Sequence, residues 1–369
     1  MKYFEYGDGK ISSLDMAITI SSMILGVGVL VLPRDLAKST LSSDGWISLT
    51  AAGLLAIAIA WLLAKISHHF SRQGFFNYVA NAVTKPVAYV ITAGLALYFF
   101  SFCGYEIGSI ANISKQYLFE RTPVEAISLT FLMVIVYAVS GRRVGLIRLN
   151  TLFLPFILVI TIIVLVFSLG ILDHENLKPM FITDWKKLSL SIKDGTFSFL
   201  GFEVILFYIT LMKKPKDAPK AVAIGVAIPL LLYIAIYLVC IGVFSQFALQ
   251  EITYPAVELA KEMQIPGEFF ERFESIFFTI WVMAVFTTTC MALDCTIYAL
   301  RSMFPKISHM TSMMILSPII YIICMMPRNT SDFSTFSSVI SYTGLVVAIV
   351  IPVLVHIIAK LRGVKSDAS

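Results

Sequence analysis

The sequence predicts an all-α polytopic membrane protein with about ten apolar helices that cross a bilayer. Hydrophobic residues make up 58% of the 369 residues and charged residues only 14%, whereas a soluble domain carries about a quarter charged residues. A spanning helix needs about 20 apolar residues, so ten spans leave room for short connections only. We therefore expect a single transmembrane domain over residues 1–369, without a separate soluble domain.

The first half of the chain contains five apolar runs that are bounded by charge, Gly or Pro. Ser12 and Asp15 have the spacing of a capping box, which predicts that the first helix begins near Ser13. We expect one spanning helix in each run, because apolar stretches of this length are typical of membrane spans. The runs lie at about 13 to 38, 46 to 66, 86 to 113, 124 to 140 and 149 to 170.

The second half contains five further runs of the same kind. Because five is an odd number, the second set would begin on the opposite side of the membrane, as in an inverted repeat of the first. These runs lie at about 191 to 212, 218 to 245, 270 to 300, 310 to 327 and 334 to 360. Helices 1–5 thus cover about 13–170, and helices 6–10 about 191–360.

The distribution of Lys and Arg predicts the orientation. With both termini inside, the inner segments hold the larger share of the 28 Lys and Arg residues, as expected when basic residues stay in the cytoplasm. These residues are spread over the connections rather than gathered on one face, so the net charge of +5 does not indicate nucleic-acid binding. The five cysteines all lie in apolar runs and indicate neither a disulfide framework nor a metal site.

Two helices carry matching interruptions. Helix one contains Gly26-Val27-Gly28, and helix six contains a stretch that ends in Phe199-Leu200-Gly201. Glycine lets a helix unwind, and the N-terminus of the half-helix that resumes presents N–H donors suited to a carboxylate. Close helix packing is the alternative for a lone Gly pair, but paired interruptions indicate a ligand site near the bilayer midplane.

Glutamates within the spans are candidates for function, because an intramembrane charge is costly. Glu106 and Glu203 lie inside apolar runs, and so does Asp294. Each requires a partner, and a structural ion pair or a solvated helix end is the alternative. The cations considered as partners are Arg34, Arg148 and Arg301.

Other polar and aromatic residues complete the candidate site. Tyr98 precedes Glu106 by eight residues and shares its helical stripe, and Phe199 and Phe202 flank the helix six break. Thr287 and Thr288 offer hydroxyls for a cation, although bonding to their own helix is the commoner outcome.

Enzyme chemistry is not indicated. The chain lacks an HExxH, a G-x-S-x-G or a P-loop motif, and no nucleophile lies beside a base at helical spacing. The adjacent His68 and His69 do not share a helix face and make a weak metal site. We therefore expect no cofactor.

Several motifs together resemble the spore germination permease family, the B subunits of nutrient germinant receptors within the amino acid-polyamine-organocation superfamily. The resemblance runs from helix one to helix ten. It is carried by GVGVLVLPR (26–34), DGWI (44–47), ERTP (120–123), FLGFE (199–203), PGEFFER (266–272), SIFFTIW (275–281) and FTT (286–288).

The resemblance implies ten helices in a five-plus-five inverted repeat of the LeuT-like kind, with helices 1 and 6 broken. A small nutrient, an amino acid by preference, would bind between the breaks. Carried over by position, Gly26 and Gly28 would supply the helix one backbone, Leu200 and Gly201 the helix six wall, and Tyr98 and Glu106 the helix three side. The implied partners are an A subunit with membrane spans and a C-subunit lipoprotein, all in the inner membrane of the bacterial spore. The distribution of Lys and Arg would then put both termini of this chain on the core side.

Two functions follow from this resemblance. The first is a sensor subunit that binds a germinant and relays binding to its partners. The alternative is a cation-coupled amino acid permease on the same fold. Helix five, from about residue 150 to 170, lacks the lysine that proton-coupled relatives often carry, which argues against proton coupling.

Overall fold

The computed structural model describes residues 9–263 and 273–364. Within these ranges six helical segments are long and apolar enough to span a membrane, and two bent helix pairs pass the same test when each pair counts as one span. The six are α3 (Gly45–His68), α5 (Lys85–Tyr117), α7 (Arg143–Ser168), α10 (Ala218–Glu251), α12 (Phe273–Met303) and the segment of α14 (Thr330–Gly344), the π-helix η5 (Leu345–Val350) and α15 (Ile351–Leu361). The bent pairs are α1 (Ser13–Ile24) with α2 (Gly28–Ser39), and α8 (Trp185–Phe197) with residues Phe202–Leu211.

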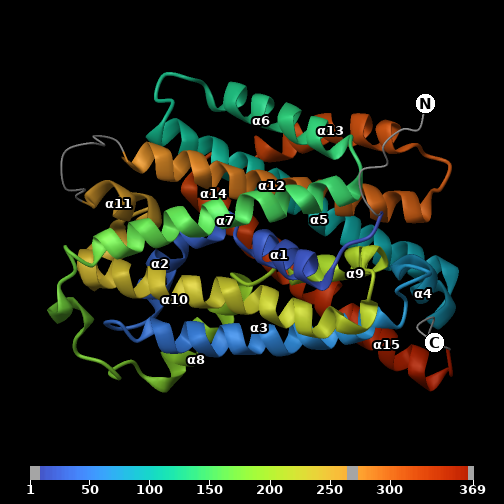
Figure 1. Cartoon of the computed structure of the whole chain (residues 1–369), viewed down its shortest axis with the longest axis horizontal. Helices are drawn as coiled ribbons and strands as arrows, with labels where there is room; N and C mark the ends of the chain where they lie inside the picture. Colours follow the sequence, from blue (N-terminus) through green and yellow to red (C-terminus); the bar gives the residue numbers. More distant parts are fainter. Residues whose placement is uncertain (1–8, 264–272, 365–369) are drawn as a thin grey trace.

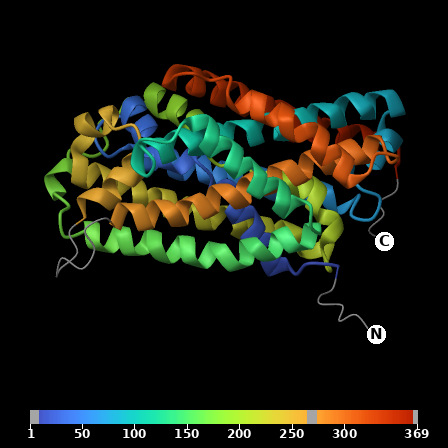
Figure 2. The ribbon, with the colours of Figure 1, turned by 90° about the horizontal axis from the view of Figure 1, so that it is seen from above.

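The long helices run side by side along the longest axis of the molecule (Figure 1). The bent pair α1 and α2 lies inside the bundle, where α1 contacts α7, α10 and α12. Figure 2 shows α7 in green and the start of α14 in red on opposite sides of the bundle. Two shorter apolar helices, α6 (Val124–Val139) and α13 (His309–Cys324), pack on each other and on α5 and α12 at the edge.

Short helices mark the two ends of the bundle. We call the end with α4 (Phe75–Ala82) and the close of α15 the α4 end, and the end with α11 (Pro255–Glu262) the α11 end; they lie at the right and left of Figure 1. Large apolar side chains on the outward helix faces are exposed, as expected where lipid rather than water surrounds the protein. Examples are Leu97, Met133, Val159, Leu231 and Ile322.

The predicted helix ranges agree with the structure for most elements, and the capping box is confirmed. The Ser12 hydroxyl accepts from the Asp15 amide at 3.2 Å, while the Asp15 carboxylate accepts from the Ser12 amide at 2.8 Å, and α1 begins at Ser13. All five cysteines are buried and have free thiols, so they pack in the interior as small apolar residues do. The PGEFFER motif at 266–272 lies outside the described residues.

Three features differ from the prediction. Helix α7 begins at Arg143 rather than near residue 149, because the charge of Arg143 is paired inside the bundle and does not end the helix. Helix α8 begins at Trp185 rather than near residue 191, since its lysines lie on an exposed face. The helices α4 and α11 were not predicted, because each is too short to give a strong periodic signal.

At the α11 end, Asp44 ties the connection between α7 and α8 to the start of α3. Its carboxylate accepts from the amides of Phe181 at 2.6 Å, Ile182 at 2.8 Å and Thr183 at 2.8 Å. Burial alone would raise the pKa of Asp44, but these hydrogen bonds outweigh burial and lower the pKa below its ordinary value. The ionised Asp44 carboxylate thereby holds this connection over the end of the bundle.

Candidate ligand site at two broken helices

The break in helix one separates α1 from α2, which meet at a bend of 57°. Three backbone carbonyls near the break accept hydrogen bonds from side chains of other helices. Thr288 of α12 donates to Ser22 O at 2.8 Å, Tyr233 of α10 donates to Ile24 O at 2.8 Å, and Trp281 of α12 donates to Gly26 O at 3.3 Å. Unpaired carbonyls would be costly here, so these contacts fix the break in place.

Glu106 of α5 caps the same break from the other side. Its carboxylate accepts from the Val27 amide at 3.2 Å, and the side chain is 2% exposed. A Cβ added at Gly26 would lie 3.0 Å from both carboxylate oxygens, so glycine is needed there for the close approach. The Glu106 carboxylate thus binds the Val27 N–H, a backbone donor of the kind that we expected a ligand to use.

Gly28 lies one step further along, at the first position of α2. An added Cβ would meet no described atom within 4 Å, and the residue is half-buried. A packing role would require a neighbour against this glycine, and the described part of the chain places none there. The Leu30 amide of α2 donates to the Val27 carbonyl at 3.0 Å, whereas the amides of Gly28 and Val29 come before the first turn can supply them with a carbonyl.

The break in helix six separates α8 from the short helices η2 (Phe202–Val204), α9 (Ile205–Tyr208) and η3 (Ile209–Leu211). Gly201 has a φ of +133°, a conformation that side chains rarely adopt. A Cβ at Gly201 would lie 3.0 Å from the backbone carbon and oxygen of Met23 in α1. Gly201 therefore lets the two breaks touch.

Glu203 caps this second break. One carboxylate oxygen accepts from the Gly201 amide at 2.7 Å, and the other accepts from the Tyr98 hydroxyl at 2.5 Å. Tyr98 and Glu106 both belong to α5, so one helix contacts both breaks. Glu203 is fully buried.

The remaining predicted residues of the ligand site gather at the same place. Phe199 is buried against Tyr233, with ring centroids 5.4 Å apart, and Tyr233 is the residue that holds the Ile24 carbonyl. Leu200, next to Phe199, is half-buried. The structure thus brings together residues of α1, α5, α10 and the break after α8, which are far apart in the sequence.

The two threonines considered for a cation site behave differently. Thr287 donates to Ala284 of its own helix at 2.9 Å, the commoner outcome, whereas Thr288 reaches across to α1. Among the described residues, no three His, Cys, Asp or Glu side chains are grouped as metal ligands. A cation at Thr287 and Thr288 stays a prediction.

The ion-pair alternative fails for the two glutamates and holds for Asp294. Within residues 9–263 and 273–364, neither Glu106 nor Glu203 has a Lys or Arg within ion-pair distance. Asp294 instead pairs with Arg143 at 2.8 Å, and the guanidinium lies over the rings of Tyr208 and Tyr298 at 4.9 and 4.1 Å.

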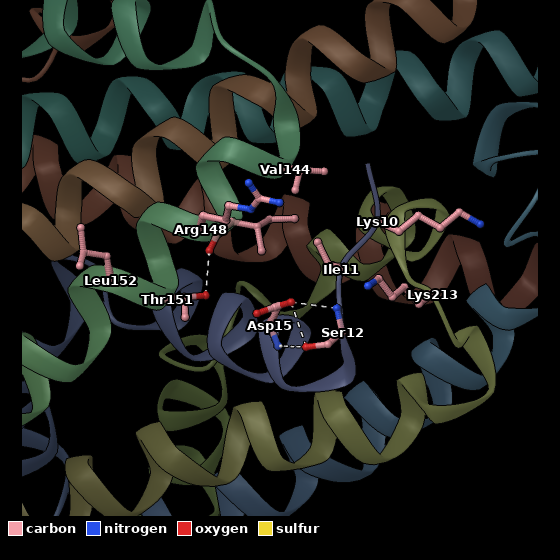
Figure 3. Close-up of a pocket in the computed structure, with 10 residues that line it drawn as sticks. Lys10, Ile11, Ser12, Asp15, Val144, Arg148, Thr151, Leu152 and Lys213 are labelled. Atoms are coloured by element: carbon pink, nitrogen blue, oxygen red, sulfur yellow. Dashed lines mark hydrogen bonds between the residues drawn. The ribbon is translucent and has the colours of Figure 1, made fainter. Parts of the chain in front are cut away.

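Arg143 was missed among the candidate partners, which were Arg34, Arg148 and Arg301. The signal for it is its position: α7 begins and α12 ends at the α4 end, so Arg143 and Asp294 lie at similar depth. Arg148, in contrast, lines a cavity of about 550 Å³ beside Asp15 and Lys10 at the start of α1 (Figure 3). That cavity shares no residue with the breaks.

Comparison with known proteins identifies the family. The family described as Spore germination protein matches residues 10–333 of this chain. Spore germination protein GerLB of Bacillus cereus is 39% identical over 98% of this chain and 97% of its own length. Spore germination protein YndE of Bacillus subtilis is 31% identical over 96% and 97%, and spore germination protein A2 of the same species is 29% identical over 96% and 97%.

Solved transporter structures share the fold. MhsT, solved in complex with L-phenylalanine, superposes with a TM-score of 0.69 at 14% identity, over 95% of this chain and 89% of that one. Mhp1, a nucleobase-cation-symport-1 family transporter, superposes with a TM-score of 0.63 at 12% identity, over 97% and 95%. At these identities the likeness shows the fold alone. With its LeuT-like helical membrane fold and a match over most of its length, this chain belongs to the spore germination protein family, which is not a family of enzymes.

Proposed function

We propose that this chain is the B subunit of a nutrient germinant receptor, which binds a small nutrient between its two broken helices and relays binding to its partners. One observation carries the proposal: the breaks touch at Gly201 and Met23 while open space remains at Gly28. A break held in place by side chains of three neighbouring helices beside open space is suited to a ligand. The names of the relatives supply the biological setting.

The chemistry at the breaks favours an amino acid as the ligand. The first N–H groups of α2, at Gly28, suit the ligand carboxylate. The Glu106 carboxylate, bound to the neighbouring Val27 amide, then lies where it can accept from the ligand ammonium group. A zwitterion offers a partner to both groups, whereas a simple anion offers none to Glu106.

The relay follows from what holds the first break. A ligand shifts the balance between two conformations only through its different affinity for them. A ligand that draws Glu106 away from Val27 alters the contact between α1 and α5, and α5 also reaches Glu203 through Tyr98. The proposed receivers are the A subunit in the membrane and the C-subunit lipoprotein.

We propose further that α6 and α13, each 16 residues long, complete ten spans in a five-plus-five inverted repeat within one domain over 1–369. The α4 end would then face the core of the spore, with the chain in its inner membrane and both termini inside. Lys216→Cys should escape an impermeant thiol reagent applied to sealed cells, and strong labelling would reverse this orientation.

A permease is the second candidate, favoured by the likeness to MhsT and Mhp1 and by the Thr288 bridge to the α1 carbonyl. Uptake of radiolabelled amino acids into proteoliposomes separates the two functions. A sensor subunit should bind without concentrating the label, and accumulation driven by a cation gradient would establish the permease.

Binding itself is tested by thermal stability of the detergent-purified protein against amino acids, sugars and nucleosides. A ligand at about 100 times its Kd stabilises the folded state by about 2.7 kcal/mol. The expected result is a shift for one amino acid that Gly28→Val removes. The matched control is Gly145→Val, since an added Cβ at Gly145 also meets no described atom within 4 Å, and this residue lies in α7 away from the breaks. Equal loss of the shift in both variants, or no shift with any amino acid, would contradict the proposal.

A further inference from the structure

A second cavity, of about 520 Å³, opens at the α4 end between α3, α4 and α15 and shares no lining residue with the breaks. Its charged and polar lining comes from Lys65 and His69 of the α3 end, Tyr78 of α4, and His356 and Lys360 of α15. Two lysines and two histidines thus line one cavity, and no carboxylate is among its described lining residues. Such a site attracts an anion.

The two histidine rings are oriented by the protein. The ring centroids lie 4.8 Å apart. The His69 Nδ1 lies 3.1 Å from the Lys65 carbonyl, which can only accept, so this nitrogen carries the proton. The His356 Nδ1 bonds to the Tyr78 hydroxyl at 2.9 Å. In each ring the Nδ1 is engaged by the protein, so the Nε2 is the nitrogen left for a ligand.

The helices around this cavity are tied together. Arg362, just after α15, donates to the carbonyls of Ala82 and Val83 at the end of α4, at 3.2 and 2.8 Å. Tyr78 stacks on Phe70, with ring centroids 4.9 Å apart. The cavity therefore has a fixed shape, as a specific site requires.

The cavity borders surface of the kind that faces lipid. The Lys65 ammonium lies over the ring of Trp61, 5.1 Å from its centroid, and Trp61 is 44% exposed. Leu62 lines the cavity and is exposed, as are Ile357 and Leu361 on α15. Trp and Lys at a helix end are typical of the membrane interface, so we expect the cavity to lie at the depth of lipid headgroups.

We propose that this cavity binds the phosphate group of an anionic phospholipid. The ammonium groups of Lys65 and Lys360 would donate to the phosphate oxygens. The His356 Nε2 would donate as well when the Tyr78 hydroxyl donates to Nδ1, whereas the His69 Nε2 would donate only from a charged ring, because its Nδ1 already carries a proton. The acyl chains would lie along the exposed apolar residues of α3 and α15. Bound lipid would join α3 to α15, the last described helix of the chain.

The test is a titration of the full-length purified protein with phosphatidylglycerol, phosphatidylcholine and inorganic phosphate at constant ionic strength, with native mass spectrometry and melting temperature as readouts. Phosphatidylglycerol should bind more tightly than phosphatidylcholine. Loss of one basic residue near an anionic lipid surface weakens binding about fivefold, so Lys65→Gln and Lys360→Gln should each have this effect. His356→Gln should weaken binding too, with melting in lipid-free detergent unchanged.

The matched control is Lys306→Gln, an exposed lysine in the connection between α12 and α13 at the same end; it should leave binding unchanged. Equal affinity for both lipids, or equal weakening by the control, would overturn the proposal. Competition by inorganic phosphate at the affinity of phosphatidylglycerol would overturn the lipid assignment in favour of a soluble anion. If the Lys65→Gln protein does not accumulate, Lys360→Gln alone tests the proposal, and the same weakening of phosphatidylglycerol binding is expected of it.

Discussion

The two helix breaks obtain their capping carboxylates from different places. Glu106 reaches Val27 from α5, 79 residues away in the sequence, whereas Glu203 caps Gly201 from two residues further along the same segment. The first break therefore depends on α5, α10 and α12, and the second largely caps itself. If the proposed ligand binds here, the break in helix one is therefore the element through which binding would reach the rest of the bundle, while the break in helix six would stay in place.

The largest loss of stability is expected at Gly201, in the break of helix six. Gly201→Ala combines a strained positive φ with a Cβ that meets the Met23 backbone at 3.0 Å, and should cost about 3 kcal/mol in stability. The melting temperature and the amount of purified protein should both fall. Gly145→Ala, at an open helical position, is the control and should change neither. A stable Gly201→Ala protein would show that the break in helix six can move, which would contradict its description as the fixed one of the two breaks.

Asp44 extends the comparison to a third carboxylate that accepts three amides from a distant connection. Asn offers only one acceptor oxygen, so Asp44→Asn should cost about 2 kcal/mol. Because the folded pKa of Asp44 lies below its ordinary value of 3.8, the stability from its ionised form is complete above that ordinary value. It is lost as the pH falls through the lower folded pKa.

Melting curves of the wild type and Asp44→Asn at neutral and acidic pH measure this effect. The difference between the two proteins should shrink as the pH falls into the range below about 4. Asp184→Asn is the control, since Asp184 accepts from a single amide, that of Lys186. A difference between wild type and Asp44→Asn that is the same at every pH would contradict a charged cap at this connection.

A smaller and more discriminating effect is expected from the two glutamates. Glu203 accepts with both oxygens, so Glu203→Gln removes a needed acceptor and should cost about 1 to 2 kcal/mol. Glu106 accepts from Val27 with one oxygen only, and Gln can keep that bond. Glu106→Gln should therefore have a stability within about 0.5 kcal/mol of wild type, yet lose the germinant response because the amide cannot become the carboxylate that would accept from the ligand ammonium group. If Glu106→Gln lost more stability than Glu203→Gln, the described difference between the two breaks would be wrong.

The sequence predicted the helices and the breaks because both depend on local signals. Apolar length marks a span, and the Gly pair at 26 and 28 and Gly201 mark the points of unwinding. The family resemblance placed Tyr98 and Glu106 at the site, and the cost of charge in a membrane singled out Glu106 and Glu203; the contact between Tyr98 and Glu203 was not predicted. These predictions required no knowledge of distances.

The partners of the freed backbone groups could not be predicted in the same way. Tyr233 and Trp281 hold carbonyls of α1, but in a chain with 13% aromatic residues nothing local distinguishes them. The pair of Arg143 and Asp294 depends on how α7 and α12 are placed beside each other. The capping of Val27 by Glu106, which takes the donor expected for a ligand, likewise appears only when α5 is placed against α1.

The germinant response of spores that carry Gly28→Val tests most directly whether the ligand binds at break one. The Cβ of a side chain at Gly28 would enter open space beside the break, with no described atom within 4 Å. We predict a normal protein level and melting temperature, a higher germinant concentration for the half-maximal response, and normal germination through unrelated receptors, with Gly145→Val spores unchanged. Normal germinant sensitivity of Gly28→Val spores at a normal protein level would contradict a ligand site at this break.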